Sequence, residues 1–162
     1  MRPVIFVVDD DPAIARLLRY TLEAENFQIH TFQSAAQVLS QTARPHLFLL
    51  DRSLPDMDGL ELCSQLRRSR LWADVPAIFV SGRSSESDRV EGLRLADDYI
   101  AKPFSPVELV TRVQAVLRCA KQHGKGCLAP PPNARLAPQS DEPAHPRSWP
   151  YPASLAPHNS NA

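Results

Sequence analysis

The chain has 162 residues, and its eighteen basic and eighteen acidic side chains give a formal net charge of +0. This balance argues against the basic surface of a nucleic-acid-binding protein. No apolar run approaches the ~18 residues that a membrane span requires, and the N-terminus lacks the apolar stretch of a signal peptide. We therefore expect a cytoplasmic protein without a membrane anchor and without direct nucleic-acid binding.

Proline divides the chain into two parts. Residues 1–120 contain seven of the sixteen prolines, and residues 121–162 contain nine. The second part shows no apolar periodicity, so it cannot bury enough surface to offset the entropy cost of ordering. We predict a folded domain over residues 1–120 and a disordered, Pro-rich tail over 121–162.

The first predicted elements are a strand and a helix. The apolar run VIFVV at 4–8 suits a strand that is covered on both faces. Asp11 and Pro12 are a favourable N-cap and first residue for the helix that follows, over 12–25. Its apolar positions recur at helical spacing and make one apolar stripe: Ile14, Leu17, Leu18, Thr21 and Leu22.

The same alternation continues to residue 118. Strands are predicted at 27–32, 46–50, 76–81 and 98–101, and helices at 34–43, 59–68, 85–95 and 105–118. On the helix at 59–68 we expect Leu60, Cys63 and Leu66 to face inward. Five strands that alternate with five helices indicate an α/β fold with a doubly wound, five-stranded parallel sheet.

Polar side chains follow four of these strands. Asp9, Asp10 and Asp11 follow the first, Asp51 the third, and Lys102 the fifth, while Ser81 ends the fourth. Parallel strands bring these positions to one edge of the sheet. Adjacent carboxylates repel one another unless a cation lies among them, and oxygen ligands suit Mg²⁺. Such a site favours phosphoryl transfer, in which one carboxylate can be the attacking group. For Asp11, capping of the following helix is a sufficient explanation without any role in the acidic site.

Four segments carry a family resemblance. VVDDDP, LLDRSLPDMDGLEL, FVSGR and DDYIAKPFSPVELVTRVQAVLR, in this order, resemble the receiver domain of bacterial two-component response regulators. The resemblance covers about residues 3–120 and implies the flavodoxin-like (βα)5 fold. It also implies a phosphoaccepting switch in a phosphorelay. Such a chain is not an enzyme in the ordinary sense, although receivers catalyse their own phosphoryl uptake and loss.

The resemblance implies a role for each residue at the edge. Asp51 would be the phosphoacceptor, and Mg²⁺ would be held by Asp9, Asp10, Asp51 and the backbone carbonyl of Ser53. Lys102, followed by a cis bond to Pro103, would contact a phosphoryl oxygen. Ser81 and Tyr99 would form the conformational switch. The implied partner is a sensor histidine kinase or a phosphotransfer protein.

The last segment most resembles receivers that carry a winged-helix DNA-binding domain. In that class the surface formed here by the helix at 85–95, the strand at 98–101 and the helix at 105–118 mediates a homodimer. The matching ion pairs would be Arg89 with Glu108 and Asp98 with Arg112. The usual glycine before Asp97 is missing, which predicts a distorted or shortened end of the helix at 85–95.

Two alternatives stay open. Because no winged-helix domain follows residue 120, the chain is either a stand-alone receiver or the truncated remnant of a DNA-binding transcriptional regulator. The spacing of Asp9 and Asp11 also matches haloacid-dehalogenase-like phosphatases, which would use Asp9 as nucleophile. That alternative leaves the segment DRSLPDMDG unexplained.

Overall fold

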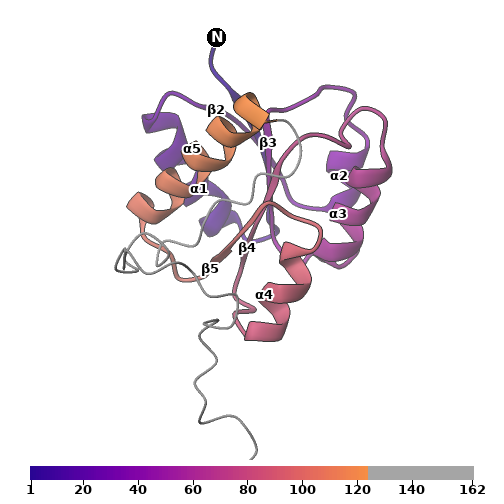
Figure 1. Cartoon of the computed structure of the whole chain (residues 1–162). Helices are drawn as coiled ribbons and strands as arrows, with labels where there is room; N and C mark the ends of the chain where they lie inside the picture. Colours follow the sequence, from indigo (N-terminus) through magenta and orange to yellow (C-terminus); the bar gives the residue numbers. More distant parts are fainter. Residues whose placement is uncertain (124–162) are drawn as a thin grey trace, which may run out of the picture. The chain divides into compact units, whose positions relative to one another are not determined.

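The computed structural model describes residues 1–123, which fold as five strands and five helices in strict alternation (Figure 1). The strands are β1 (Val4–Val8), β2 (Gln28–Phe32), β3 (Leu47–Leu50), β4 (Ala77–Ser81) and β5 (Asp98–Ala101). The helices are α1 (Pro12–Ala24), α2 (Ala35–Leu39), α3 (Gly59–Arg68), α4 (Glu86–Leu93) and α5 (Pro106–His123). No helix within these residues is long and apolar enough to cross a membrane.

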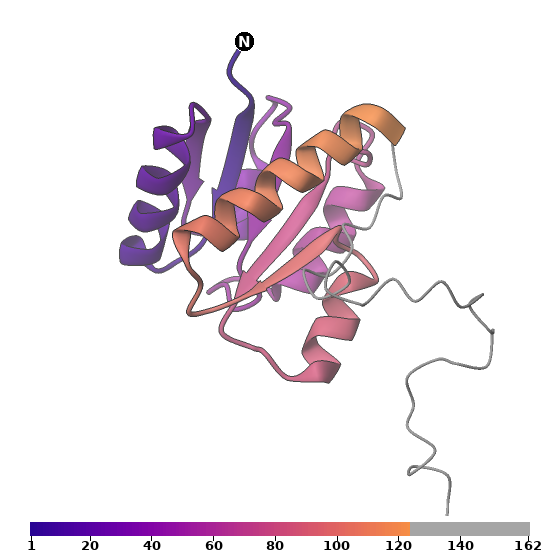
Figure 2. The ribbon, with the colours of Figure 1, turned by 60° about the vertical axis from the view of Figure 1, so that its left-hand side comes forward.

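The five strands form one parallel sheet in the order β2-β1-β3-β4-β5. Figure 2 shows α5 lying across one face of this sheet, on the same side as α1. α2, α3 and α4 cover the other face (Figure 1). Each face has its own apolar cluster, with Leu18 and Val113 on the α1–α5 side and Leu62 and Tyr99 on the other. The predicted doubly wound, flavodoxin-like sheet is confirmed.

β2, β3 and β4 each begin one residue later than predicted, and α4 spans Glu86–Leu93 rather than 85–95. The larger differences concern two other helices. α2 ends at Leu39 rather than residue 43, and α5 runs to His123 rather than 118. Leu17 of the predicted apolar stripe is 41% exposed, because the α1 face that meets the sheet is centred on Ala15, Leu18 and Leu22. The predicted tail lies, from residue 124 on, outside the described residues.

The turn from α4 to β5 is built without a left-handed residue. The C-cap, Arg94, has φ of −69°, and the amides of Leu95 and Ala96 both donate to the carbonyl of Gly92. Asn26 is the one non-glycine residue with positive φ in the described part of the chain, and it lies elsewhere. The short connection therefore closes on ordinary right-handed backbone, as the missing glycine requires.

Candidate acidic site at the carboxyl edge of the sheet

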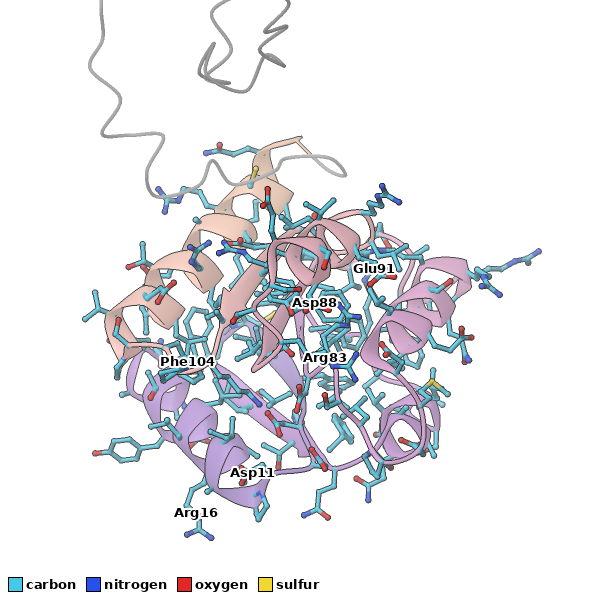
Figure 3. All side chains as sticks on the ribbon, turned by 90° about the horizontal axis from the view of Figure 1, so that it is seen from below. Asp11, Arg16, Arg83, Asp88, Glu91 and Phe104 are labelled. Carbon is cyan, nitrogen blue, oxygen red and sulfur yellow. The ribbon has the colours of Figure 1, made fainter. Side chains whose placement is uncertain are left out.

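Three carboxylates gather where β1 and β3 leave the core. Oxygens of Asp9, Asp10 and Asp51 lie within 4.8 Å of one another. Asp9 and Asp51 are 2% and 7% exposed, whereas Asp10 is exposed. Figure 3 looks onto this edge, with Asp11 on the α1 side and Arg83 on the α4 side. The topology thus brings the predicted acidic residues together.

Lys102 supplies the positive charge of the site. Its Nζ lies 2.8 Å from Asp9 Oδ2 and 3.4 Å from Asp51 Oδ2. Burial lowers the pKa of Lys102, but the hydrogen bond and charge of Asp9 and the charge of Asp51 outweigh it and hold the pKa above its ordinary value. Burial likewise raises the pKa of Asp9, although the hydrogen bond from Lys102 opposes that rise. The predicted cis bond between Lys102 and Pro103 is confirmed.

Backbone hydrogen bonds orient the two buried carboxylates. The amide of Asp11 donates to Asp9 Oδ1 at 2.9 Å, and the amide of Ser53 donates to Asp51 Oδ1 at 3.2 Å. Asp11 itself caps α1 by accepting from the amide of Ala13. Asp11 therefore acts as the predicted N-cap, which weighs against its part in a phosphatase pair with Asp9.

The start of α3 packs directly on the backbone of Asp51. A Cβ added at Gly59 would lie 2.2 Å from the Asp51 carbonyl oxygen and 2.8 Å from Arg52 Cα. The amide of Gly59 donates to the Arg52 carbonyl at 2.9 Å. Only glycine permits this approach, so Gly59 fixes the backbone that carries the acidic side chain.

The loop between Asp51 and α3 is anchored by two further carboxylates that the sequence analysis did not assign. Asp56 accepts from the amides of Ala36 and Ala35, and these bonds lower the pKa of Asp56. Asp58 caps α3 by accepting from the amide of Leu60. An Asp directly before a predicted helix was a signal for the cap, but nothing local indicated that Asp56 reaches α2.

Ser81 and Tyr99 both contact the backbone of one residue, Arg83. Both side chains are buried, at 0% and 1% exposure. Ser81 Oγ accepts from the amide of Arg83 at 3.1 Å, and the Tyr99 hydroxyl donates to the Arg83 carbonyl. The Tyr99 ring packs against Gly92 of α4, where an added Cβ would lie 2.7 Å from the ring. The two residues predicted as a switch thus both hydrogen-bond to the backbone of Arg83.

The residues of the predicted dimer face are largely paired within the chain. Arg112 donates to both carboxylate oxygens of Asp98, at 2.9 and 3.0 Å, and its Nε lies 3.3 Å from Glu108. Asp98 is 6% exposed, whereas Arg89 is exposed. An intersubunit pair at Asp98 would therefore have to replace or share an existing one.

The acidic site is chemically suited to a hard divalent cation. All three side chains offer carboxylate oxygens, and no sulfur or imidazole ligand from residues 1–123 joins them in the cluster. Such oxygen-rich sets match Mg²⁺ better than Zn²⁺ or copper. A cation there would also relieve the repulsion between Asp9 and Asp51.

Comparison with known proteins identifies the family to which the chain belongs. The model of the response regulator receiver domain family matches residues 5–114. The chain is 46% identical over 124 residues to the phosphate regulon transcriptional regulatory protein PhoB of Rhizobium meliloti, covering 75% of this chain and 55% of that protein. It is 39% identical over 152 residues to the transcriptional regulatory protein CreB of Escherichia coli, covering 91% and 64%. The chain thus spans less than two thirds of these relatives.

Solved structures match over the folded part. A CheY-like receiver domain protein from Methanospirillum hungatei superposes with a TM-score of 0.71 at 31% identity, over 76% of this chain and 100% of that one. The BeF3-activated DrrB receiver domain gives a TM-score of 0.68 at 31% identity, over 73% and 99%. Fold, acidic edge and family match agree, and the chain belongs to the response regulator receiver domain family.

Proposed function

We propose that the chain is a phosphoaccepting switch of a two-component phosphorelay, with Asp51 as the acceptor. The observation that carries this proposal is the placement of Asp51. Its carboxylate lies beside Asp9 and Asp10 and 3.4 Å from the Lys102 ammonium, at the open carboxyl edge of the sheet. Asp9 is less suited to attack, because its two oxygens are held more closely, at 2.9 Å by the amide of Asp11 and at 2.8 Å by Lys102. The corresponding contacts of Asp51, from the amide of Ser53 and from Lys102, are 3.2 and 3.4 Å.

Mg²⁺ would be held by the carboxylates of Asp9, Asp10 and Asp51 and by the carbonyl of Ser53. When bound, the ion supplies charge neutralisation for a phosphoryl group. An Asp51 oxygen then forms a bond to phosphorus while the bond from phosphorus to the donor's leaving atom breaks. Lys102 stabilises a phosphoryl oxygen as a point charge. Its positive charge and that of the metal lower the energy needed to form the acyl phosphate on Asp51.

The connection through Arg83 gives a physical route for the Ser81 and Tyr99 switch. A phosphoryl group on Asp51 offers strong acceptor oxygens to the Ser81 hydroxyl. If Ser81 turns toward them, its Oγ leaves the amide of Arg83, whose carbonyl holds the Tyr99 hydroxyl. Movement of this turn would reach α4, because the Tyr99 ring packs on Gly92.

The phosphoryl donor would be a sensor histidine kinase or a phosphotransfer protein, and the reaction would take place in the cytoplasm. The relatives named transcriptional regulatory proteins favour a role in regulating transcription, with a partner or a further domain contacting DNA. A homodimer through α4, β5 and α5 would use the exposed Arg89 and the 41% exposed Glu108. Val90 of α4, at 50% exposure, would add apolar contact.

The proposed function is tested by incubating the purified chain with acetyl phosphate, with Mg²⁺ or with a chelator, and by measuring intact mass and molecular size. We expect stoichiometric labelling that requires Mg²⁺ and is absent in Asp51→Asn. Lys102→Ala should keep some labelling but lose any change in size or exchange behaviour. Unchanged labelling of Asp51→Asn, or labelling independent of metal, would contradict the proposal.

A further inference from the structure

Arg52 is a buried cation that neither the acceptor chemistry nor the core explains. Its side chain is 2% exposed, although arginine is rarely buried without close partners. It follows Asp51 directly and contacts α4 at Asp88 and Glu91, both labelled in Figure 3. The guanidinium therefore joins the backbone of the acidic site to a helix on the covering layer.

The contacts of Arg52 are numerous but long. Its Nη1 donates to the Asp88 carbonyl at 3.2 Å, its Nη2 lies 3.4 Å from Glu91 Oε2, and its Nε lies 3.5 Å from Asp58 Oδ1. Strong charge-assisted bonds are shorter, at about 2.7–2.9 Å. Arg52 Nε is also the one buried side-chain nitrogen or oxygen within residues 1–123 that has no hydrogen-bond partner.

The two carboxylates that face Arg52 are accessible to water. Asp58 is 42% exposed and Glu91 is 58% exposed, and Asp58 also pairs with Arg83 at 3.6 Å. The Arg52 guanidinium otherwise lies over the Phe79 ring, with Cζ 5.9 Å from the centroid. A buried charge held by long bonds to hydrated acids is weakly compensated, so its attachment to α4 is easily exchanged.

We propose that Arg52 is a positioning residue that ties α4 to the acidic loop in the unphosphorylated chain and loosens this tie when Asp51 is phosphorylated. The tie itself follows from the contacts of Arg52 given above. Its loosening on phosphorylation of Asp51 rests on the proposed function. A phosphoryl group adds roughly −1.5 to −2 charge next to Arg52. That charge competes with Glu91 and the Asp88 carbonyl for the guanidinium, so α4 is freed to present a different surface.

Hydrogen exchange of the full-length chain, followed by mass spectrometry, tests the tie first without phosphodonor. In Glu91→Gln and Arg52→Met we expect amides of α4 to exchange about threefold to tenfold faster than in the wild type, as for loss of a weak ion pair. Arg52→Lys should show an intermediate increase, because one ammonium cannot reach three acceptors. Amides of β1 should not change, which separates this effect from global unfolding.

The matched control is Glu86→Gln, which neutralises another exposed carboxylate on the same helix. Because Glu86 lies in the first turn of α4, where a negative charge favours the helix, its neutralisation should raise α4 exchange less than that of Glu91 does. Equal exchange in wild type and Glu91→Gln, or the same increase in Glu86→Gln, would overturn the tie.

The second measurement adds acetyl phosphate and Mg²⁺ to the same samples. We expect exchange of α4 to rise on labelling in the wild type and to rise much less in Arg52→Met, which lacks the guanidinium that contacts both Glu91 and the Asp88 carbonyl. An equal rise in both proteins would overturn the part of Arg52 in switching. Absence of labelling in every sample would contradict the proposed function, while the measurement without phosphodonor still decides the tie.

Discussion

Two arginines on the α3 side of the sheet have opposite surroundings. Arg67, near the amino ends of β4 and β5, is 25% exposed and makes four contacts of 2.5–3.4 Å, to the carbonyls of Leu95, Ala73 and Val75 and to the carboxylate of Asp97. Arg52, at the carboxyl edge, is more deeply buried yet has longer contacts and an unpartnered Nε. Burial alone therefore does not separate a stabilising arginine from one that can move.

The comparison extends to the carboxylates of the two edges. Asp97 Oδ2 accepts from Arg67 and also from the amide of Ala77, so it closes the amino end of β4. Asp9 and Asp51 instead share the ammonium of Lys102 and lie within reach of each other. At the amino edge, the charged groups are paired within the chain. At the carboxyl edge, two carboxylates share one ammonium, which leaves negative charge that a metal ion can neutralise. Functional sites commonly carry such unrelieved charge at a cost in stability.

The largest effect should come from breaking the pairing at the amino edge. Arg67→Met should lower the free energy of unfolding by about 2–3 kcal/mol, because it leaves the Asp97 carboxylate and partly buried carbonyls without their donor. Urea unfolding measures the change. Arg68→Met is the control, since Arg68 is exposed and donates only to Ser64 among the contacts seen here, so its effect should stay below about 0.5 kcal/mol. Equal losses in the two variants would contradict the contrast.

Removing a carboxylate from the carboxyl edge should have a smaller effect on the free energy of unfolding, and of opposite sign. Burial raises the pKa of Asp9, so its ionised form costs stability at neutral pH. Asp9→Asn should therefore stabilise the chain in chelator by about 1 kcal/mol at pH 7. As pH falls through the folded-state pKa toward about 4, Asp9 protonates in the wild type as well, and the difference should vanish. Thermal unfolding across this range, with Asp10→Asn as control, measures it; destabilisation by Asp9→Asn would contradict the account.

The smallest signal should come from Cys63, which lies on α3 close to Arg67. It is 0% exposed, and burial raises the pKa of its thiol to about 11. The thiolate should be nearly absent at pH 8, so iodoacetamide should modify Cys63 only after denaturation. Peptide mass spectrometry of the native and the denatured chain measures the modification. Rapid modification of native Cys63 would show that this region opens more readily than its contacts imply.

Much of the fold was predictable because local signals agreed with one another. β1, α3 and β5 have the predicted bounds, because local residues mark their ends. β1 stops before Asp9, α3 runs from Gly59 to a basic pair, and β5 stops before Lys102 and Pro103. Asp9, Asp51 and Lys102 meet because parallel strands end at one edge, which topology alone implies. The exposure of Leu17 was not predictable, because helical spacing gives the width of an apolar stripe but not which part of it faces the sheet.

The surroundings of Arg52 could not be predicted from the sequence. A basic residue after a buried strand is ordinarily assigned to solvent, and its burial depends on where α4 lies. The pairing of Arg67 with Asp97 depends likewise on two turns that meet only in the folded chain. The positions of acidic residues at strand ends were local information, whereas the partners of the arginines were tertiary.

The most direct test of the central claim is to identify the labelled residue. Borohydride reduces an acyl phosphate on aspartate to homoserine, and peptide mass spectrometry then locates the change. After treatment with acetyl phosphate and Mg²⁺, we predict homoserine at position 51 and none at positions 9, 10 or 11. Reduction at Asp9 with Asp51 unchanged would contradict the account and would favour a phosphatase-like use of the same edge.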